Sequence, residues 1–192
     1  MDSLEKIRKE VLKCEKCPLA KERKKNSYLP VIGQGRSNSR IMFVGEAPGL
    51  KEAETGKPFQ GRAGKILDEL LKEAGIEREE VYISNVLKDR PPGNRNPGKE
   101  EVRACGSFLD RQIMIIKPKA VCAMGNFSAR YLFEKCGLKF PGISKARGRI
   151  YEGECGSGKI KIIPLYHPAA AIYNRSLENL MKRDFRKLKK IL

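Results

Sequence analysis

Three polar side chains, Glu46, Asn85 and His167, each lie at the end of an apolar run that is typical of a strand. Because open α/β sheets place ligands at the carboxyl ends of their strands, these side chains are expected to meet at one cleft. A carboxylate, an amide and an imidazole supply acid–base groups together with donors and acceptors of hydrogen bonds. The alternatives are a solvent-exposed glutamate on a tight turn and a single histidine with a structural role.

The first apolar run and the turn after it would organise this cleft. The run, Ile41–Val44, is typical of a strand buried on both faces, and the turn Gly45–Gly49 follows it. Glycines adopt backbone angles that other residues resist, whereas Pro48 fixes its φ and lacks an amide hydrogen. Phe59 returns to the same region after a short loop, before a helix that starts near Ala63.

The six cysteines are unevenly spaced. Cys14 and Cys17 form a Cys-x-x-Cys pair, which can bring two thiolates to one metal and also occurs in redox proteins. The other four are isolated: Cys105, Cys122, Cys136 and Cys155. Because disulfides are rare inside cells, no disulfide framework is expected, and Cys136 and Cys155 are predicted to be ordinary free thiols. Cys122 lies in an apolar run, where a small buried residue is expected.

The charge of the chain is strongly unbalanced. Forty Lys and Arg residues against 23 Asp and Glu residues give a net charge of +17 over 192 residues. Such an excess favours a polyanionic partner, most often nucleic acid, although a highly charged thermophile surface is the alternative. No apolar run is long enough to span a bilayer, and the charged N-terminus is unlike a signal peptide, so a soluble intracellular protein without a membrane partner is expected.

Apolar periodicity predicts the elements that position these residues. Strands are predicted at residues 41–44, 81–87, 119–124, 150–154 and 159–164, the last two as a hairpin around Gly156-Ser157-Gly158. Helices are predicted at residues 2–13, 63–74, 99–116, 128–135 and 177–192, and residues 21–40 are predicted to form a loop. Strands that alternate with helices indicate a three-layer α/β fold, here as a single domain over residues 1–192.

Five motifs can be compared with those of known families. They are Gly45-Glu46-Ala47-Pro48-Gly49, Pro58-Phe59-Gln60-Gly61-Arg62-Ala63-Gly64, Ser84-Asn85-Val86-Leu87-Lys88, Arg90-Pro91-Pro92-x-Asn94-Arg95 and His167-Pro168-Ala169. In order and spacing they resemble the family-four uracil-DNA glycosylases, the iron–sulfur members of that superfamily, over nearly the whole chain. The resemblance implies a three-layer α/β/α fold with a central, mostly parallel four-stranded sheet, and an enzyme that excises uracil from DNA.

The resemblance also implies roles in that reaction, in which a nucleotide is flipped out and its bond between uracil and deoxyribose is hydrolysed. Asn85 would pair with O4 and N3–H of uracil, an arrangement that cytosine cannot match, and Phe59 would stack on the base. His167 would donate a hydrogen bond to O2, where negative charge builds up as the bond breaks. With Glu46, these polar residues are the expected catalytic set.

Two glutamates are the acidic candidates. Related families carry an aspartate that activates or orients water, and the corresponding residue here is Ala47. The resemblance therefore gives the water or the sugar cation to Glu46 and to backbone groups of the turn that begins at Gly45. Glu52 corresponds to an acidic position near uracil C5, where it would exclude a thymine methyl group. Two solvated glutamates without these roles are the alternative.

The resemblance implies a 4Fe–4S cluster held by four cysteines. Cys14, Cys17 and Cys105 match the family positions, whereas Asp89 stands at the fourth, in Lys88-Asp89-Arg90-Pro91-Pro92. Three thiolates do not complete a four-cysteine site. Three outcomes remain open: Asp89 ligates the fourth iron, the site holds a three-iron cluster, or the cluster is absent. A cluster would act structurally, tying the N-terminal helix to residues 88–105.

Basic residues in loops near these motifs are expected to contact DNA phosphates, which position a protein without reading sequence. They are Lys88, Arg90, Arg95, Arg147 and Arg149, with Lys145 and Arg175 as further candidates. Ile172 or Tyr173 would fill the space left by the flipped base, unless they belong to the core. The expected partner is uracil-containing DNA, single- or double-stranded, bound by a monomer in a prokaryotic cytoplasm and nucleoid. A sliding clamp is a further partner to test.

Three other functions compete with this hypothesis. One is a non-catalytic nucleic-acid-binding protein on the same fold, although DNA binding alone requires none of Glu46, Phe59, Asn85 and His167. A second is a glycosylase with a broader choice of deaminated bases, against which the Asn85 amide favours uracil. A third is a zinc-stabilised Cys-x-x-Cys protein, which colour and metal analysis would distinguish.

Overall fold

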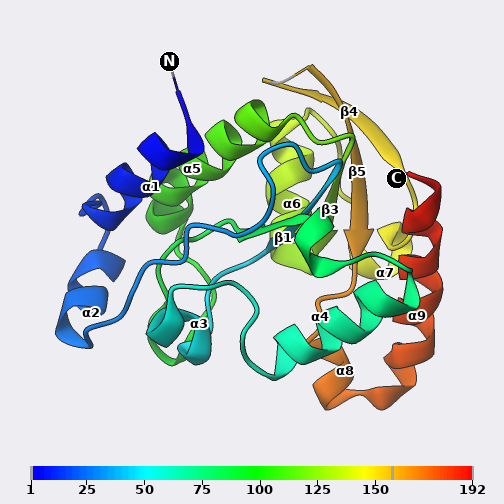
Figure 1. The fold of residues 1–192 in the computed structure, drawn as a ribbon, viewed down its shortest axis with the longest axis horizontal. Coiled ribbons are helices and arrows are strands. Elements are labelled where there is room, and N and C mark those ends of the chain that lie inside the picture. Colours follow the sequence, from blue (N-terminus) through cyan, green and yellow to red (C-terminus); the bar gives the residue numbers. More distant parts are fainter. Residues whose placement is uncertain (1, 157, 192) are drawn as a thin grey trace.

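The computed structural model describes residues 2–156 and 158–191, and these residues contain one five-stranded sheet (Figure 1). Its strands are β1 (Ile41–Gly45), β2 (Tyr82–Asn85), β3 (Ala120–Met124), β4 (Tyr151–Cys155) and β5 (Gly158–Leu165), in the order β2-β1-β3-β5-β4. Four strands are parallel, and β4 pairs antiparallel with β5 at the edge. The predicted α/β fold is confirmed. The predicted number of four strands in the sheet was wrong, because the second strand of the predicted hairpin is joined in the sheet by the first, β4. The tip of the hairpin, Ser157, lies outside the described residues.

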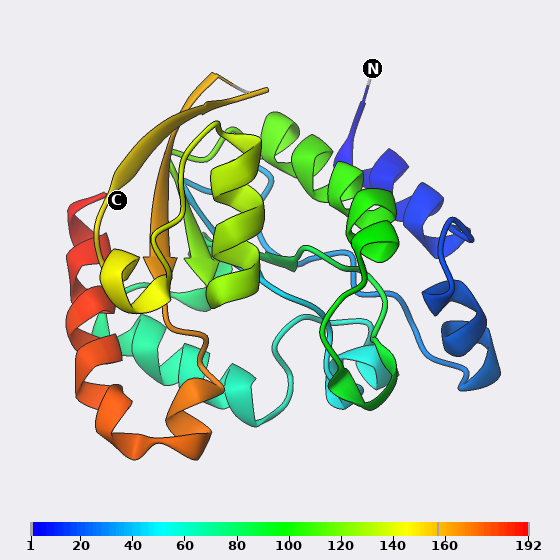
Figure 2. The same cartoon turned by 180° about the vertical axis from the view of Figure 1, so that it is seen from behind.

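Helices cover both faces of the sheet, as Figures 1 and 2 show from opposite sides. On one face, α4 (Arg62–Glu73) and α9 (Glu178–Arg186) pack against Ile41 and Phe43 of β1. On the other, α5 (Lys99–Ile116) and α6 (Asn126–Lys135) pack against Met42 and Val44. Successive strand residues point to opposite faces, so the continuous apolar run of β1 feeds both cores.

Several elements differ from the prediction. Residues 21–40 were predicted to be a loop, which was wrong at its start, because α2 spans Leu19–Lys25 and buries Leu19 and Ala20. The predicted C-terminal helix is divided into three pieces. The remaining elements are α1 (Leu4–Leu12), α3 (Leu50–Thr55), α7 (Ile143–Ala146) and α8 (Ala170–Tyr173), with short 3₁₀ helices η1 (Arg78–Glu80), η2 (Pro92–Asn94), η3 (Arg175–Leu177) and η4 (Lys187–Lys190). None of the described helices combines the length and apolar character that crossing a membrane requires.

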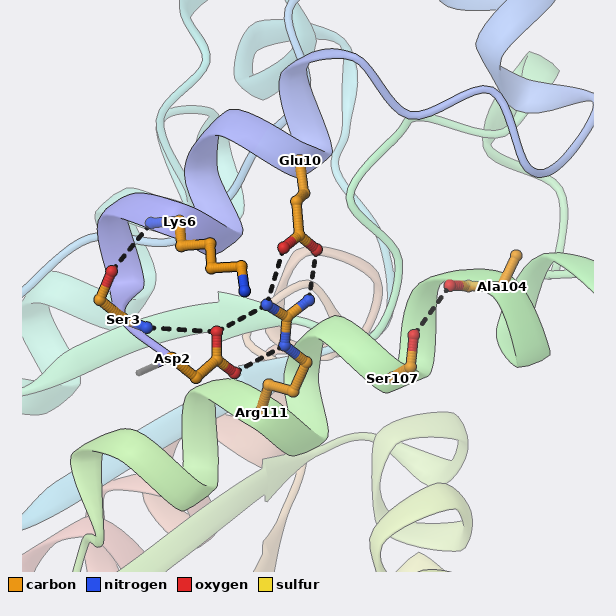
Figure 3. A network of polar contacts seen from close by, with 7 residues as sticks. All are labelled: Asp2, Ser3, Lys6, Glu10, Ala104, Ser107 and Arg111. Carbon is orange, nitrogen blue, oxygen red and sulfur yellow. Dashed lines mark hydrogen bonds and ion pairs between the residues drawn. The ribbon is translucent and has the colours of Figure 1, made fainter.

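The N-terminal helix α1 lies along α5 (Figure 3). Ile7 and Val11 pack with Phe108 in a small apolar cluster. Beside it, the guanidinium of Arg111 donates to both carboxylate oxygens of Asp2 at 2.7 Å and also to Glu10. These contacts anchor the first described residues to the long helix.

The structure joins Cys136 and Cys155 in a disulfide, with Cα atoms 4.7 Å apart. The prediction that both are free thiols was therefore wrong. Cys136 ends α6 and Cys155 ends β4, and the packing of this helix end against the edge strand brings the residues together over a separation of 19 positions. Single-sequence spacing contains no signal for such a contact, whereas the prediction of a buried Cys122 is confirmed.

Candidate active site

The site begins where β1 and β2 end side by side. Gly45 lies directly opposite Asn85 in the parallel register. A Cβ atom added to Gly45 would lie 2.3 Å from Asn85 Oδ1 and 3.0 Å from Phe59 Cζ. Only a residue without a side chain leaves both groups in place, which gives the glycine of this turn a specific function.

The loop that carries Phe59 is held by its neighbours. Phe59 adopts a left-handed backbone conformation with φ of 53°, which costs a residue with a side chain about 1–2 kcal/mol. Glu52 Oε1 accepts hydrogen bonds from the backbone N–H groups of Gln60 (2.6 Å) and Gly61 (2.9 Å). Gly64 allows the helix that follows to approach, since a Cβ there would lie 1.9 Å from the Phe59 carbonyl oxygen. Glu52 thus holds the loop that carries Phe59 in place.

His167 follows β5 and faces Phe59. The two rings are stacked, with centroids 5.6 Å apart and an interplanar angle of 29°. The backbone N–H of Ala169 donates to His167 Nδ1 at 3.1 Å, so the proton of the neutral imidazole lies on Nε2. Burial lowers the pKa of His167 to about 4, which keeps the ring neutral near pH 7. The imidazole is therefore arranged as a neutral hydrogen-bond donor.

These residues enclose a cavity of about 360 Å³, within the range of small-molecule sites. The side-chain amide of Asn85 has no hydrogen-bond partner among the described residues, although Asn85 is only 2% exposed. Burial raises the pKa of Glu46, a half-buried carboxyl at the same cavity. The cavity thus presents one unpaired amide, one carboxyl group and one imidazole N–H to whatever binds there.

Six residues expected at the substrate line this one cavity: Glu46, Ala47, Glu52, Phe59, Asn85 and His167. Arg95 and Tyr173, which were predicted to contact DNA, line it as well. Pro48 and Gly49, from the turn whose backbone groups were expected to act on the water or the sugar cation, line the cavity too. Sequence reasoning assigned no role to four other lining residues, namely Ala63, Pro91, Asn94 and Ala169. All four lie within the motifs, and that position was the available signal.

Lys88 was predicted to contact phosphate, and this was wrong. Its side chain is 1% exposed, and Nζ donates to Ser84 Oγ, the Asn85 carbonyl oxygen and Gln112 Oε1, each at 2.8 Å. Burial lowers the pKa of Lys88 to about 7. Lys88 belongs to a buried polar network beneath Asn85 that the sequence did not indicate, because it depends on Gln112 from α5.

The other basic candidates divide into two groups. Arg147 pairs with the buried Asp184 and lies over the Tyr166 ring, and Arg95 pairs with Glu101 at the cavity. Arg90 donates from Nε to Asn94 Oδ1 at 2.9 Å and is partly buried. Lys145, Arg149 and Arg175 form the second group and are exposed. Arg95 is exposed as well, although it pairs with Glu101. Arg90 and Arg147 are partly buried, so the predicted phosphate contacts differ in accessibility.

The cysteine region does not present the expected ligand set. A hydrogen bond between the thiols of Cys17 and Cys105 lowers the pKa of Cys17 to about 7. The same hydrogen bond, together with burial, raises the pKa of Cys105. Both carboxylate oxygens of Asp89 accept hydrogen bonds from Arg23 Nη1, at 2.9 and 2.7 Å. Within residues 2–156 and 158–191, no three His, Cys, Asp or Glu side chains are grouped to hold a metal ion. The donors therefore do not fit a cluster with four ligands.

Comparison with known proteins places this chain in a family. The profile of the uracil DNA glycosylase superfamily matches residues 32–190. The type-4 uracil-DNA glycosylase of Sulfurisphaera tokodaii is 46% identical over 100% of this chain and 86% of its own. Those of Archaeoglobus fulgidus and Thermotoga maritima are 45% and 43% identical, each over 98% of this chain and over 92% and 94% of their own. The chain belongs to the uracil DNA glycosylase superfamily and, within it, to the type-4 uracil-DNA glycosylases.

Proposed function

We propose that this protein excises uracil from DNA by hydrolysing the N-glycosidic bond, leaving an abasic site for base excision repair. The names of its relatives carry this activity, and the observation that supports it in this chain is the shared cavity of Phe59, Asn85 and His167. DNA binding without chemistry would not require an apolar ring, a buried amide and a neutral imidazole to converge.

Recognition of uracil rests on the Asn85 amide. The Asn85 amide faces the cavity without a hydrogen-bond partner among the described residues, so the site favours a ligand that both donates to it and accepts from it. Uracil offers the acceptor O4 beside the donor N3–H, whereas cytosine offers the opposite pattern. Phe59 provides the apolar surface on which the base lies, and the loop held by Glu52 fixes that surface. In this proposal Glu52 positions Phe59, whether or not it also excludes a thymine methyl group.

Bond cleavage leaves negative charge on the uracil and positive charge on the sugar. The Nε2–H of His167 donates to O2 as charge accumulates there. Because the imidazole is already neutral with its proton on Nε2, it can donate this hydrogen bond without first gaining or losing a proton. The carboxylate of Glu46 lies at the same cavity, where it stabilises the sugar cation or orients the attacking water. Ala47 contributes no carboxylate, so Glu46 is the single acidic residue assigned to this step.

Contacts to the rest of the DNA follow from exposure. Tyr173 is 89% exposed at the rim of the cavity, whereas Ile172 is partly buried, so we assign the wedge that replaces the flipped base to Tyr173. Arg149 and the other exposed basic residues supply phosphate contacts. We propose that residues 1–192 act as one domain and one monomer on uracil-containing DNA in the cytoplasm.

A 4Fe–4S cluster is the cofactor that membership in this family suggests. In this chain the thiols of Cys14, Cys17 and Cys105 are the residues available to hold iron and sulfide. Because the residues do not complete a four-ligand set, no step of the reaction is assigned to a cluster.

The test is base release from matched oligonucleotides that carry uracil, thymine or hypoxanthine opposite guanine, and from single-stranded uracil DNA. Uracil is expected to be released and thymine retained if Glu52, which lines the cavity, also excludes a thymine methyl group at C5. DNA binding without release of any base would reject the proposal in favour of a binding protein. Equal release of uracil and hypoxanthine would replace it with an enzyme of broader specificity.

A further inference from the structure

Asp89 stands where the resemblance places the fourth cluster cysteine, and its surroundings indicate a different function. We infer that Asp89 is not an iron ligand, and that the Arg23–Asp89 ion pair replaces that cysteine as the link between α2 and the segment that follows β2. Arg23 thereby becomes a positioning residue for one wall of the cavity.

The Arg23–Asp89 pair is buried, and its hydrogen bonds occupy both carboxylate oxygens. Arg23 is 8% exposed and Asp89 is 5% exposed, and Nη1 of Arg23 donates to both carboxylate oxygens. The other terminal nitrogen, Nη2, donates to the backbone carbonyl oxygen of Cys14 at 2.7 Å. One guanidinium therefore joins the Cys-x-x-Cys segment, α2 and the β2 end. Removing either charge would leave the other buried and unpaired, which is strongly unfavourable.

Ligation of iron by Asp89 would compete with this pair. A metal-bound carboxylate oxygen gives up lone-pair capacity that Arg23 now occupies, and a cationic guanidinium reduces its affinity for an iron ion. Burial raises the pKa of Asp89 while Arg23 opposes that rise. The arrangement thus satisfies this carboxylate as it stands.

The segments that a cluster would tie together are already joined by other contacts. Leu19 of α2 packs with Leu87 and Cys105 in a buried cluster. The N-terminal helix is anchored on α5 through Arg111 (Figure 3). The ion pair adds a buried polar connection, and it lies next to the segment in which Pro91 and Arg95 line the active-site cavity. A weakened pair should therefore loosen that wall.

The test combines a double-mutant cycle with metal analysis on anaerobically purified protein. Arg23→Met and Asp89→Asn are each expected to lower the thermal unfolding midpoint by roughly 10 °C, and the double variant no further than one of them, because the two residues form one interaction. Iron and acid-labile sulfide per chain are expected to be the same in Asp89→Asn as in the wild type. Lys24→Met on the same helix, which breaks an exposed pair with Glu15, is the matched control and should barely change the midpoint.

Asp89→Cys completes a four-cysteine set. Its iron content shows whether a thiolate at position 89 can ligate iron where the paired carboxylate does not. This variant is expected to hold more iron than the wild type, because a thiolate then replaces the paired carboxylate. Arg23→Met is also expected to raise the KM for uracil DNA more than it lowers kcat, a division that a mere loss of folded protein does not produce. Iron content and unfolding do not depend on the proposed uracil activity, so failure of that activity would be recognised separately.

Two results would overturn the inference. One is a wild type that already holds as much iron as Asp89→Cys and loses it in Asp89→Asn, which would make the carboxylate a ligand. The other is additive destabilisation in the double variant, which would mean that Arg23 and Asp89 act independently.

Discussion

The active-site cavity and the cysteine region were both predicted from motifs. The structure brings the predicted residues together at the cavity, whereas it does not assemble the predicted ligand set in the cysteine region. At the cavity, residues from the ends of β1, β2 and β5 and from the Phe59 loop converge as their motifs required. In the cysteine region, one of four expected ligands is missing, and Asp89 is bound to Arg23 instead. A motif therefore predicts geometry only while each of its members keeps its chemical type.

The physical reason lies in how strictly each site constrains its residues. Gly45, Asn85 and Phe59 are packed within a few ångströms of one another, so a change at one position displaces the next. The cysteine segments are also held by apolar packing and by Arg111, so a lost ligand can be compensated without changing the fold. The predictions that follow test this difference.

The largest effect should come from the polar residues of the cavity. Asn85→Ala and His167→Ala are each expected to reduce kcat for uracil excision by about 10²–10³-fold, because each removes a hydrogen bond to developing negative charge or to the base. DNA affinity should stay close to that of the wild type. Single-turnover cleavage and binding to a uracil oligonucleotide would measure both, and wild-type cleavage by either variant would remove that residue from the site.

Gly45→Ala tests how tightly the cavity is packed. The new methyl group would meet Asn85 Oδ1 at 2.3 Å, so the amide must move and excision should fall by about 10²-fold. Gly93→Ala provides a control, since its added Cβ meets nothing within 4 Å. Because φ is 60° at Gly93, that control should lose some stability but keep its excision rate. Equal excision by Gly45→Ala and the wild type would show that the cavity adapts.

Lys88→Met separates a buried network from a DNA contact. It should destabilise the fold by about 1–3 kcal/mol, because Gln112 Oε1 and Ser84 Oγ lose their donor. The salt dependence of DNA binding should not change. Denaturant unfolding and binding at several salt concentrations would measure these effects, and a shallower salt slope would return Lys88 to the phosphate contacts.

Arg149→Ala should do the reverse. Arg149 is exposed, so folding stability should change little, while the slope of log affinity against log salt should decrease by about 1 as one phosphate contact is lost. Arg147→Ala is the contrasting variant, since Arg147 pairs with the buried Asp184 and should mainly lose stability. A salt slope that is unchanged in Arg149→Ala would exclude this residue from the DNA contacts.

The smallest effect on the excision rate is expected from pH. The pKa of His167 lies near 4 in the fold, below its ordinary 6.5, so the excision rate should show no titration near pH 6.5. Between pH 6.5 and 4 the unfolded chain binds a proton that the folded chain does not, so this histidine makes stability fall as pH falls. Because asparagine does not titrate, the stability of His167→Asn should fall less than that of the wild type as the pH is lowered from 6.5 to 4. A rate transition near pH 6.5 would show that the ring is accessible and charged during the reaction.

The sequence by itself determined the α/β class, the positions of the strands and the set of residues at the carboxyl ends of β1, β2 and β5. Local apolar periodicity predicts buried strands, and the carboxyl ends of adjacent parallel strands meet at one edge, so Glu46, Asn85 and His167 could be placed together. The family motifs added Phe59 and the identity of the base. The charge excess favoured nucleic acid, a partner that family membership supports.

Only the tertiary structure decided which residues are paired. Lys88 was exposed in the prediction and proved buried because Gln112, 24 positions away, reaches its ammonium group. Cys136 met Cys155 through the edge strand β4, and Asp89 met Arg23 over 66 positions through a helix that was predicted to be a loop. Such partners are far apart in the chain, and local sequence patterns contain no information about contacts that arise only when separate elements pack together.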